Sequence, residues 1–307
     1  MNSKLLVLTI WLATAASACV AEKYASVDAL KAAAQSGNPT SQFDLGMAFY
    51  LGDGIRQHYQ EAAKWFKKAA EQGVTDAQNN LGLMYGKGQG VRQDFSKSYE
   101  WFKKAADAGN VSAEYNLGDS YDFGHGVKQD SAVAAKWYEK AALQGDADAQ
   151  NSLGSLYEHG EGVETNNQKA AEWYKKSADQ GHPDATINLA YMYLKGRGVE
   201  TNAAKAYEMN LKMANAGYLR AMLNVAIQLR DGDGVQQDKI EAYKWMDLAR
   251  YYTLTTSAIR LKWQIRVVYD PLHEELSKQG GIAEADRRGK EWQKTHRVHT
   301  PPYGRYY

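Results

Sequence analysis

Cysteine, proline and net charge are all scarce in this sequence. Its 307 residues include one cysteine and five prolines, and the formal net charge is +1. A single cysteine cannot form an intrachain disulfide, so packing must stabilise the fold. Few prolines and many alanines favour helices, because proline breaks a helix interior and alanine costs least there. The balanced charge, without a dense Lys/Arg run, predicts that nucleic acid is not a partner.

Long apolar runs are also missing, except at the start of the chain. Residues 1–21 combine a positively charged beginning, an apolar run from Leu5 to Ala16 and the small residues Ala16-Ser17-Ala18. This order predicts a secretory signal peptide, which is too short for a stable membrane span. No later stretch approaches the roughly 18 apolar residues of a spanning helix. We therefore expect an exported, soluble mature chain.

The sole cysteine, Cys19, directly follows Ala18. In one interpretation Cys19 is the lipidated first residue of a bacterial lipoprotein, although Ala16 stands where such a motif usually has leucine. In the other interpretation, cleavage near Ala18 or Ala21 leaves Cys19 without a role. Both predict export to the periplasm, with secretion outside the cell as the alternative. Only the first adds a membrane contact, through a lipid anchor.

A pattern with a period of 36 residues runs through the chain without insertions. A Leu-Gly pair and its weakened forms recur at Leu45-Gly46, Leu81-Gly82, Leu117-Gly118, Leu153-Gly154, Leu189-Ala190 and Val225-Ala226. A second column is almost all tryptophan, at Trp65, Trp101, Trp137, Trp173, Met209 and Trp245. Self-similarity at such a period is the signature of a repeat architecture.

Each repeat is predicted to be a hairpin of two helices. In the second repeat the first helix runs from about Ala77 to Tyr85, with its apolar stripe spaced i, i+4. A Gly-x-Gly-Val turn follows, and the second helix runs from about Asp94 to Ala108. Gly82 costs helix stability, which suggests that neighbouring backbones approach closely there. The strict spacing of the tryptophan column predicts core positions.

Such hairpins bury their apolar faces only by stacking, so the ends of the array need caps. We therefore divide the chain into a signal peptide, an N-terminal capping helix with the start of the first repeat helix, six repeats, C-terminal capping helices and an irregular tail. In the same order, these five parts are residues 1–21, 22–44, 45–260, 261–295 and 296–307. Within the C-terminal cap, residues 272–293 are predicted to form one charged helical segment.

The columns A-x-x-x-L-G-x-x-Y-x-x-G-x-G-V and A-x-x-W-[FY]-x-x-A-A-x-x-G resemble the Sel1-like repeat, a relative of the tetratricopeptide repeat. In one unit the match is carried by Ala149, Leu153, Gly154, Tyr157, Gly160, Gly162, Val163, Ala170, Trp173, Tyr174, Ala178 and Gly181. The resemblance covers about residues 29–260. It implies an all-α, right-handed α-solenoid of antiparallel helix hairpins that binds partner proteins. Exported bacterial members of the family serve as envelope scaffolds, regulators and toxin inhibitors.

Catalysis is not expected. The Gly-x-Gly-Val motif occurs six times between predicted helices, whereas a nucleotide loop follows a strand and occurs once. His125 and His159, in consecutive loops, make a poor metal site, as do His296 and His299 in the tail, because zinc usually takes three or four ligands. No serine or cysteine nucleophile has an evident base. We therefore predict no enzyme activity, no cofactor and no metal. An enzyme acting on cell-wall or β-lactam substrates is the minor alternative.

Partner-binding residues are placed by analogy with tetratricopeptide arrays, whose first helices line the concave groove. The positions two before, two after and five after the leucine column should face a partner there. The candidate partner-binding residues are Phe43, Met47, Tyr50, Asn79, Leu83, Tyr115, Asp119, Asn151, Ser155 and Tyr191. A neighbouring column is expected to make structural bonds from side chain to backbone, at Asn80, Asn116, Asn188 and Asn224.

These observations predict a monomeric, non-catalytic scaffold or regulator of the bacterial envelope. It would bind an exported or envelope protein in its groove. An inhibitor or immunity protein of an exported toxin is the alternative within the same class.

Overall fold

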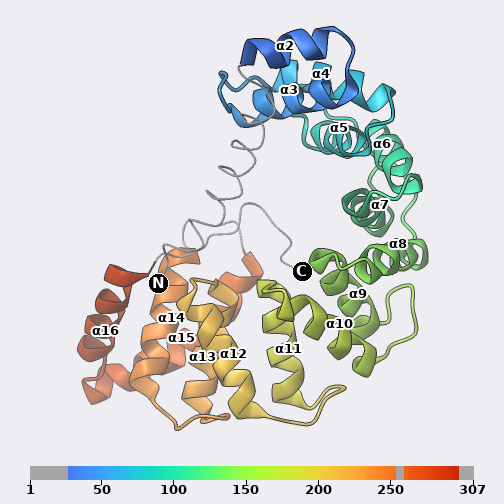
Figure 1. Cartoon of the computed structure of the whole chain (residues 1–307). Helices are drawn as coiled ribbons and strands as arrows, with labels where there is room; N and C mark the ends of the chain where they lie inside the picture. The colour runs from blue at the N-terminus through green and yellow to red at the C-terminus, as the bar shows by residue number, and fades with distance from the viewer. Residues whose placement is uncertain (1–26, 254–258, 297–307) are drawn as a thin grey trace. The chain divides into compact units, whose positions relative to one another are not determined.

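A computed structural model describes residues 27–253 and 259–296, and every regular element in these ranges is an α-helix (Figure 1). The predicted signal peptide, Cys19 and the tail beyond His296 lie outside the described residues. Within the described ranges, no helix is long and apolar enough to cross a membrane. The expectation of an all-α solenoid is confirmed by the helix pairs below.

The chain divides into two compact units, with the boundary after Asp146. The helices of the N-terminal unit are α2 (Val27–Gln35), α3 (Pro39–Leu51), α4 (Tyr59–Glu71), α5 (Thr75–Lys87), α6 (Phe95–Asp107), α7 (Val111–Phe123) and α8 (Ser131–Leu143). Those of the C-terminal unit are α9 (Ala147–His159), α10 (Asn167–Asp179), α11 (Pro183–Lys195), α12 (Ala203–Asn215), α13 (Leu219–Asp231), α14 (Lys239–Thr253), α15 (Ile259–Gln279) and α16 (Ile282–Thr295).

Helices that follow one another in sequence pack together within each unit. In the N-terminal unit the hairpins are α3/α4, α5/α6 and α7/α8, and α2 packs against α3 as a cap. In the C-terminal unit they are α9/α10, α11/α12 and α13/α14, with α15 and α16 packed on α14. Each hairpin buries its apolar stripe against the next one in its unit, which is how a repeat array obtains a continuous core.

The glycine after the repeat leucine lies under an aromatic ring. A Cβ on Gly82 would be 2.6 Å from Cε1 of Phe102 on the second helix of the same hairpin. The same arrangement joins Gly46 to Phe66, Gly118 to Tyr138 and Gly154 to Tyr174. The expectation that two backbones approach each other at this glycine is therefore wrong, because a side chain fills the space.

The six repeats differ at this glycine position, and the difference explains its role. In the fifth and sixth repeats alanine replaces it, at Ala190 and Ala226, and the ring position holds Asn210 and Met246. Both alanines are fully buried. Glycine is thus present in the repeats that place a ring there and absent from the two that do not.

The tryptophan column is half-buried rather than core. In the first four repeats a lysine three residues later covers the indole ring, with Nζ to centroid distances of 4.1, 4.3, 5.1 and 3.9 Å for Trp65–Lys68, Trp101–Lys104, Trp137–Lys140 and Trp173–Lys176. Only Trp245 of this column is buried. The core column is the next residue, which is Phe66 in the first repeat. Cation–π stacking therefore accounts for part of the tryptophan pattern.

Within each unit, the second glycine of the Gly-x-Gly-Val loop packs on the preceding repeat at Gly90, Gly126, Gly198 and Gly234. A Cβ on Gly126 would be 2.0 Å from the backbone oxygen of Phe95, where the second helix of that repeat begins. Gly90 meets Tyr59 in the same way, and in the C-terminal unit Gly198 meets Asn167. The loop is therefore a contact between repeats, which only a residue without a side chain can make.

The C-terminal cap consists of two helices, α15 and α16, so the prediction of one segment over 272–293 is wrong. The break falls at Gly280, whose φ is 78°. The Trp292 ring packs edge-on against Trp245, with centroids 5.5 Å apart, and its Nε1 donates to Asn215. This cap covers the apolar end of the last hairpin.

Candidate functional site: the first-helix faces

Side-chain hydrogen bonds join the first helices of successive repeats. In the N-terminal unit Asn116 Nδ2 donates to Asn79 Oδ1 at 2.8 Å, and in the C-terminal unit Asn188 Nδ2 donates to Asn151 Oδ1 at 3.1 Å. The expectation of side-chain-to-backbone bonds is therefore wrong for this column. These amide pairs align α5 with α7 and α9 with α11, so each unit has its own first-helix face.

We define the N-terminal face by the half-buried candidates of α3, α5 and α7. They are Phe43, Met47, Tyr50, Leu83, Tyr115 and Asp119. Asn79, the remaining candidate on these helices, is only 8% exposed and bonds Asn116, so it offers a partner little surface.

The first part of the N-terminal face is aromatic and apolar. Phe43 lies 5.8 Å from Phe66, and Tyr50 lies 5.3 Å from Tyr59, between ring centroids. The Tyr50 hydroxyl donates to Gln89 Oε1 at 3.2 Å, and burial raises the pKa of Tyr50. These side chains are held in place by the repeats and still reach solvent. Preorganised aromatic groups of this kind are the usual anchors of protein interfaces.

The face becomes acidic at the third repeat. The Tyr138 hydroxyl donates to Asp119 Oδ1 at 2.7 Å and lies 3.5 Å from Asp122 Oδ2. Burial of Tyr138, together with these two carboxylates, raises its pKa, so the hydroxyl remains a donor at neutral pH. The ring that covers Gly118 thus also delivers a hydroxyl to the face.

The second-helix ring and the polarity of the face vary together. Where the ring is Phe66 or Phe102, the residue two after the repeat leucine is Met47 or Leu83. Tyr138 instead has an aspartate acceptor there. The sequence shows that the two columns vary together. The reason, a hydrogen bond between the two helices, is visible only in the structure.

The face of the C-terminal unit carries the most exposed candidate, Tyr191, at 40%. The Arg197 guanidinium lies 5.6 Å from the Tyr191 ring and donates to Glu158 Oε1 at 3.2 Å. Glu158 Oε2 also accepts from the Tyr174 hydroxyl at 3.0 Å. The candidates Asn151 and Ser155 are half-buried on α9. This unit therefore combines an aromatic ring with a network of charged hydrogen bonds.

His125 and His159, two of the histidines considered as metal ligands, have other contacts. His125 stacks on Phe95 at 4.7 Å between centroids, and His159 Nδ1 lies 2.9 Å from the backbone oxygen of Ser155. In the described part of the chain, no group of three or more histidine, cysteine, aspartate or glutamate side chains could hold a metal ion.

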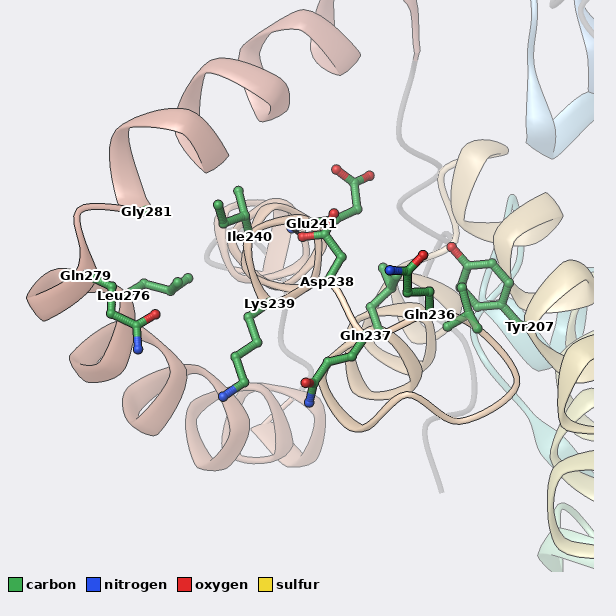
Figure 2. A pocket seen from close by; sticks show the side chains of 12 residues that line it. Tyr207, Gln236, Gln237, Asp238, Lys239, Ile240, Glu241, Leu276, Gln279 and Gly281 are labelled. Carbon is green, nitrogen blue, oxygen red and sulfur yellow. Dashed lines mark hydrogen bonds between the residues drawn. The ribbon is translucent and has the colours of Figure 1, made fainter.

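A pocket of about 640 Å³ lies in the C-terminal unit, where the last repeat meets the cap. Figure 2 shows Gln237 and Lys239 pointing to the same side of it, with Leu276 and Gln279 of α15 across from Tyr207 of α12. Lys239 Nζ lies 2.5 Å from Glu275 Oε1. The described residues that line the pocket include no serine, cysteine, threonine or histidine.

Comparisons with known proteins follow the repeat pattern. A family model, the Sel1 repeat, matches residues 39–74, 75–110, 111–146, 147–182, 183–218 and 219–250. Each match begins at or next to the start of a first helix. A search of curated proteins gave no match.

The solved structures that are similar to this chain include two that share 30% or more of their sequence with it. One is a protective antigen present in uropathogenic Escherichia coli strains, which displays an SLR fold; it is 30% identical with a TM-score of 0.69, over 88% of this chain and 60% of that one. The other is a Sel1 repeat protein from Oxalobacter formigenes, 35% identical with a TM-score of 0.65, over 71% of this chain and 89% of that one. The alignment thus spans about 60% of the length of the E. coli antigen.

Proposed function

This chain belongs to the Sel1 repeat family, and from that premise we propose that it is a scaffold or regulator of the bacterial envelope that holds a partner protein against its first-helix faces. Proteins built from Sel1 repeats mediate protein–protein interaction and are typically not catalytic. The observation that carries the proposal is the contrast between two kinds of column on the same helices.

The leucine column is buried and nearly invariant, whereas the column two residues after it varies and remains part-exposed. Leu45, Leu81 and Leu117 are at most 1% exposed. Two residues further on stand Met47, Leu83, Asp119, Ser155 and Tyr191. Because the same fold accepts all five, their identities are free to encode recognition rather than stability.

The polarity of the N-terminal face suggests the kind of partner segment. Phe43, Met47 and Leu83 offer apolar surface, and Asp119 adds negative charge beyond them. An amphipathic segment with apolar anchors followed by a basic group would match this order. The apolar contacts would supply most of the affinity, and the charge would set the direction of binding.

The test replaces face residues by those that other repeats place in the same columns. In the combined variant Phe43→Asn, Met47→Ser, Leu83→Ser, the new residues are those of Asn79 and Ser155. The partner is first identified by crosslinking in intact cells, and its affinity is then measured with the purified chains. We expect binding to weaken by about 30-fold or more, because truncated anchors typically lose about 2 kcal/mol or more.

A matched control changes three exposed positions on the second helices: Lys64→Ala, Glu100→Ala and Lys136→Ala. Partner affinity and helicity should both stay at the wild-type level in this control. If the face variant keeps its helicity and still binds with wild-type affinity, the first-helix face is not the binding site.

We also propose export, which rests on the predicted signal peptide. Deleting residues 2–21 should leave the chain in the cytoplasm, because the apolar run and the small residues before the cleavage site are lost. Fractionation of cells expressing both forms measures this directly, and a Cys19→Ser variant separates lipid anchoring from simple cleavage. Recovery of the truncated form in the periplasm would contradict the proposal.

A further inference from the structure

One loop column changes its charge from the N-terminal to the C-terminal unit. The residue that follows the Gly-x-Gly-Val/Ile motif is Arg56, Arg92, Lys128, Glu164, Glu200 and Gln236 in the six repeats. All six loops begin with a left-handed glycine, and all six side chains are exposed. Because the same loop accepts either charge or none, the fold does not require the switch in sign.

The three cations that this loop column contributes to the N-terminal unit form no ion pair with the described residues. Within the described residues, no ion pair includes Arg56, Arg92 or Lys128. Several lysines on the second helices differ; for example, Lys64 pairs with Glu61 and Lys103 with Asp107. We name Arg56, Arg92 and Lys128 the basic edge.

The loops of the C-terminal unit carry unpaired carboxylates. Glu164 and Glu200 occupy the column itself, and Glu161 lies between the two glycines of the fourth loop. All three are exposed, and no ion pair within the described part of the chain includes them. We name Glu161, Glu164 and Glu200 the acidic edge.

An exposed aromatic side chain accompanies the basic edge. Phe95 is 39% exposed at the start of α6 and stacks on His125, which also lies 5.8 Å from Phe123 between ring centroids. The later repeats have Ser131, Asn167 and Ala203 in the Phe95 column, so the fold does not need the ring. Phe95 therefore offers an apolar anchor among charges that would orient a partner.

We propose that the chain associates with a second copy of itself, with the basic edge of one copy against the acidic edge of the other. The charge complementarity is present within one sequence, and each set is exposed and unpaired before association. Two copies that make this contact reciprocally form a closed pair with two-fold symmetry. If the contact is made only once between two copies, it is heterologous and builds a ring or an open chain of copies. This goes beyond the monomer expected from the sequence and uses a surface other than the first-helix faces.

Sedimentation velocity of the chain from residue 22 onward tests the association. We expect concentration-dependent dimers or larger species between about 1 and 100 μM, the range of weak transient interfaces. They should form at about 0.1 M salt, where charges act over ~10 Å, and dissociate at about 1 M, where the range is ~3 Å. A monomer at every concentration in low salt would overturn the proposal.

Charge exchange identifies the surface. One variant carries Arg56→Glu, Arg92→Glu and Lys128→Glu, and the other carries Glu161→Lys, Glu164→Lys and Glu200→Lys. Each variant alone should associate at least tenfold more weakly than wild type, because its two edges then repel. An equal mixture should associate again, since the first variant is acidic at both edges and the second is basic at both. Failure of the mixture to recover would overturn the proposed pairing.

Two further variants distinguish the effect of charge at the edges from the effects of total charge and of misfolding on association. Lys67→Glu, Lys103→Glu and Lys136→Glu impose the same charge change on the second helices and should leave association at the wild-type level. Replacement of the basic edge by glutamine, the residue at Gln236, should weaken association without creating repulsion. Association equal to wild type in the folded glutamine variant, or loss in the second-helix control alone, would contradict the basic edge as the contact.

Discussion

Replacing Gly126 by alanine is expected to destabilise the array by about 4 kcal/mol, from left-handed backbone strain and steric overlap together. The φ angle of Gly126 is 76°, and an added Cβ would lie 2.0 Å from the backbone oxygen of Phe95. That oxygen belongs to the first residue of α6, so it cannot move without displacing the helix. Urea unfolding followed by circular dichroism measures the loss.

The matched control is Gly109→Ala in the same unit. Gly109 has a φ of 84°, similar to that of Gly126, but a Cβ added to Gly109 would meet no heavy atom within 4 Å. Only the backbone strain remains in this variant, so we expect its free energy of unfolding to fall by about 1 kcal/mol. Equal losses in the two variants would mean that the loop glycine does not form the proposed contact between repeats.

Replacing Gly82 by alanine should cost about 2 kcal/mol, because overlap with the Phe102 ring of about 3 kcal/mol exceeds a helix-propensity gain of about 1 kcal/mol. The added Cβ would lie 2.6 and 2.7 Å from two carbons of the ring. Phe102 is buried, so its ring has little room to shift. The measurement is again the free energy of unfolding in urea.

The same substitution should reverse its sign once the ring is removed. In a Phe102→Ala background, Gly82→Ala meets no ring and should stabilise by about 1 kcal/mol, from helix propensity alone. The coupling of the two changes is then about 3 kcal/mol, at the upper end for residues in contact. Ala190, which stands opposite Asn210, shows that the column accepts a methyl group when the ring is absent. An equal cost in both backgrounds would contradict the contact.

The period of the repeat predicted the architecture because local sequence sets the helix spacing, and each hairpin can bury its leucine only by stacking on its neighbours. The expected helix over Ala77–Tyr85 is α5, Thr75–Lys87, and the turn falls at Gly88. The prediction that the tryptophan column is buried in the core was wrong, because strict repetition does not by itself require burial. Trp65 packs on the cluster formed by α2 and α3 and stacks on Lys68, while the buried position is Phe66.

The candidate face was chosen by analogy with tetratricopeptide arrays, and the contacts of its side chains could not be predicted. The analogy put Met47 and Asp119 in the same column of the first helices. The hydrogen bond from Tyr138 to Asp119 joins two helices, and sequence spacing alone does not reveal it. The charges of the loop residues could likewise be identified in the sequence. Their exposure and their lack of ion pairs depend on the positions of the neighbouring side chains.

Site-specific photocrosslinking in intact cells tests the central claim, partner binding on the first-helix faces, most directly. A photoreactive amino acid is placed singly at Leu83 and Tyr191 on the faces, and at Lys64 and Lys136 on the second helices. We predict one discrete crosslinked product, with the same partner, from both face positions and none from the second-helix positions. A product from the second helices alone would contradict this claim.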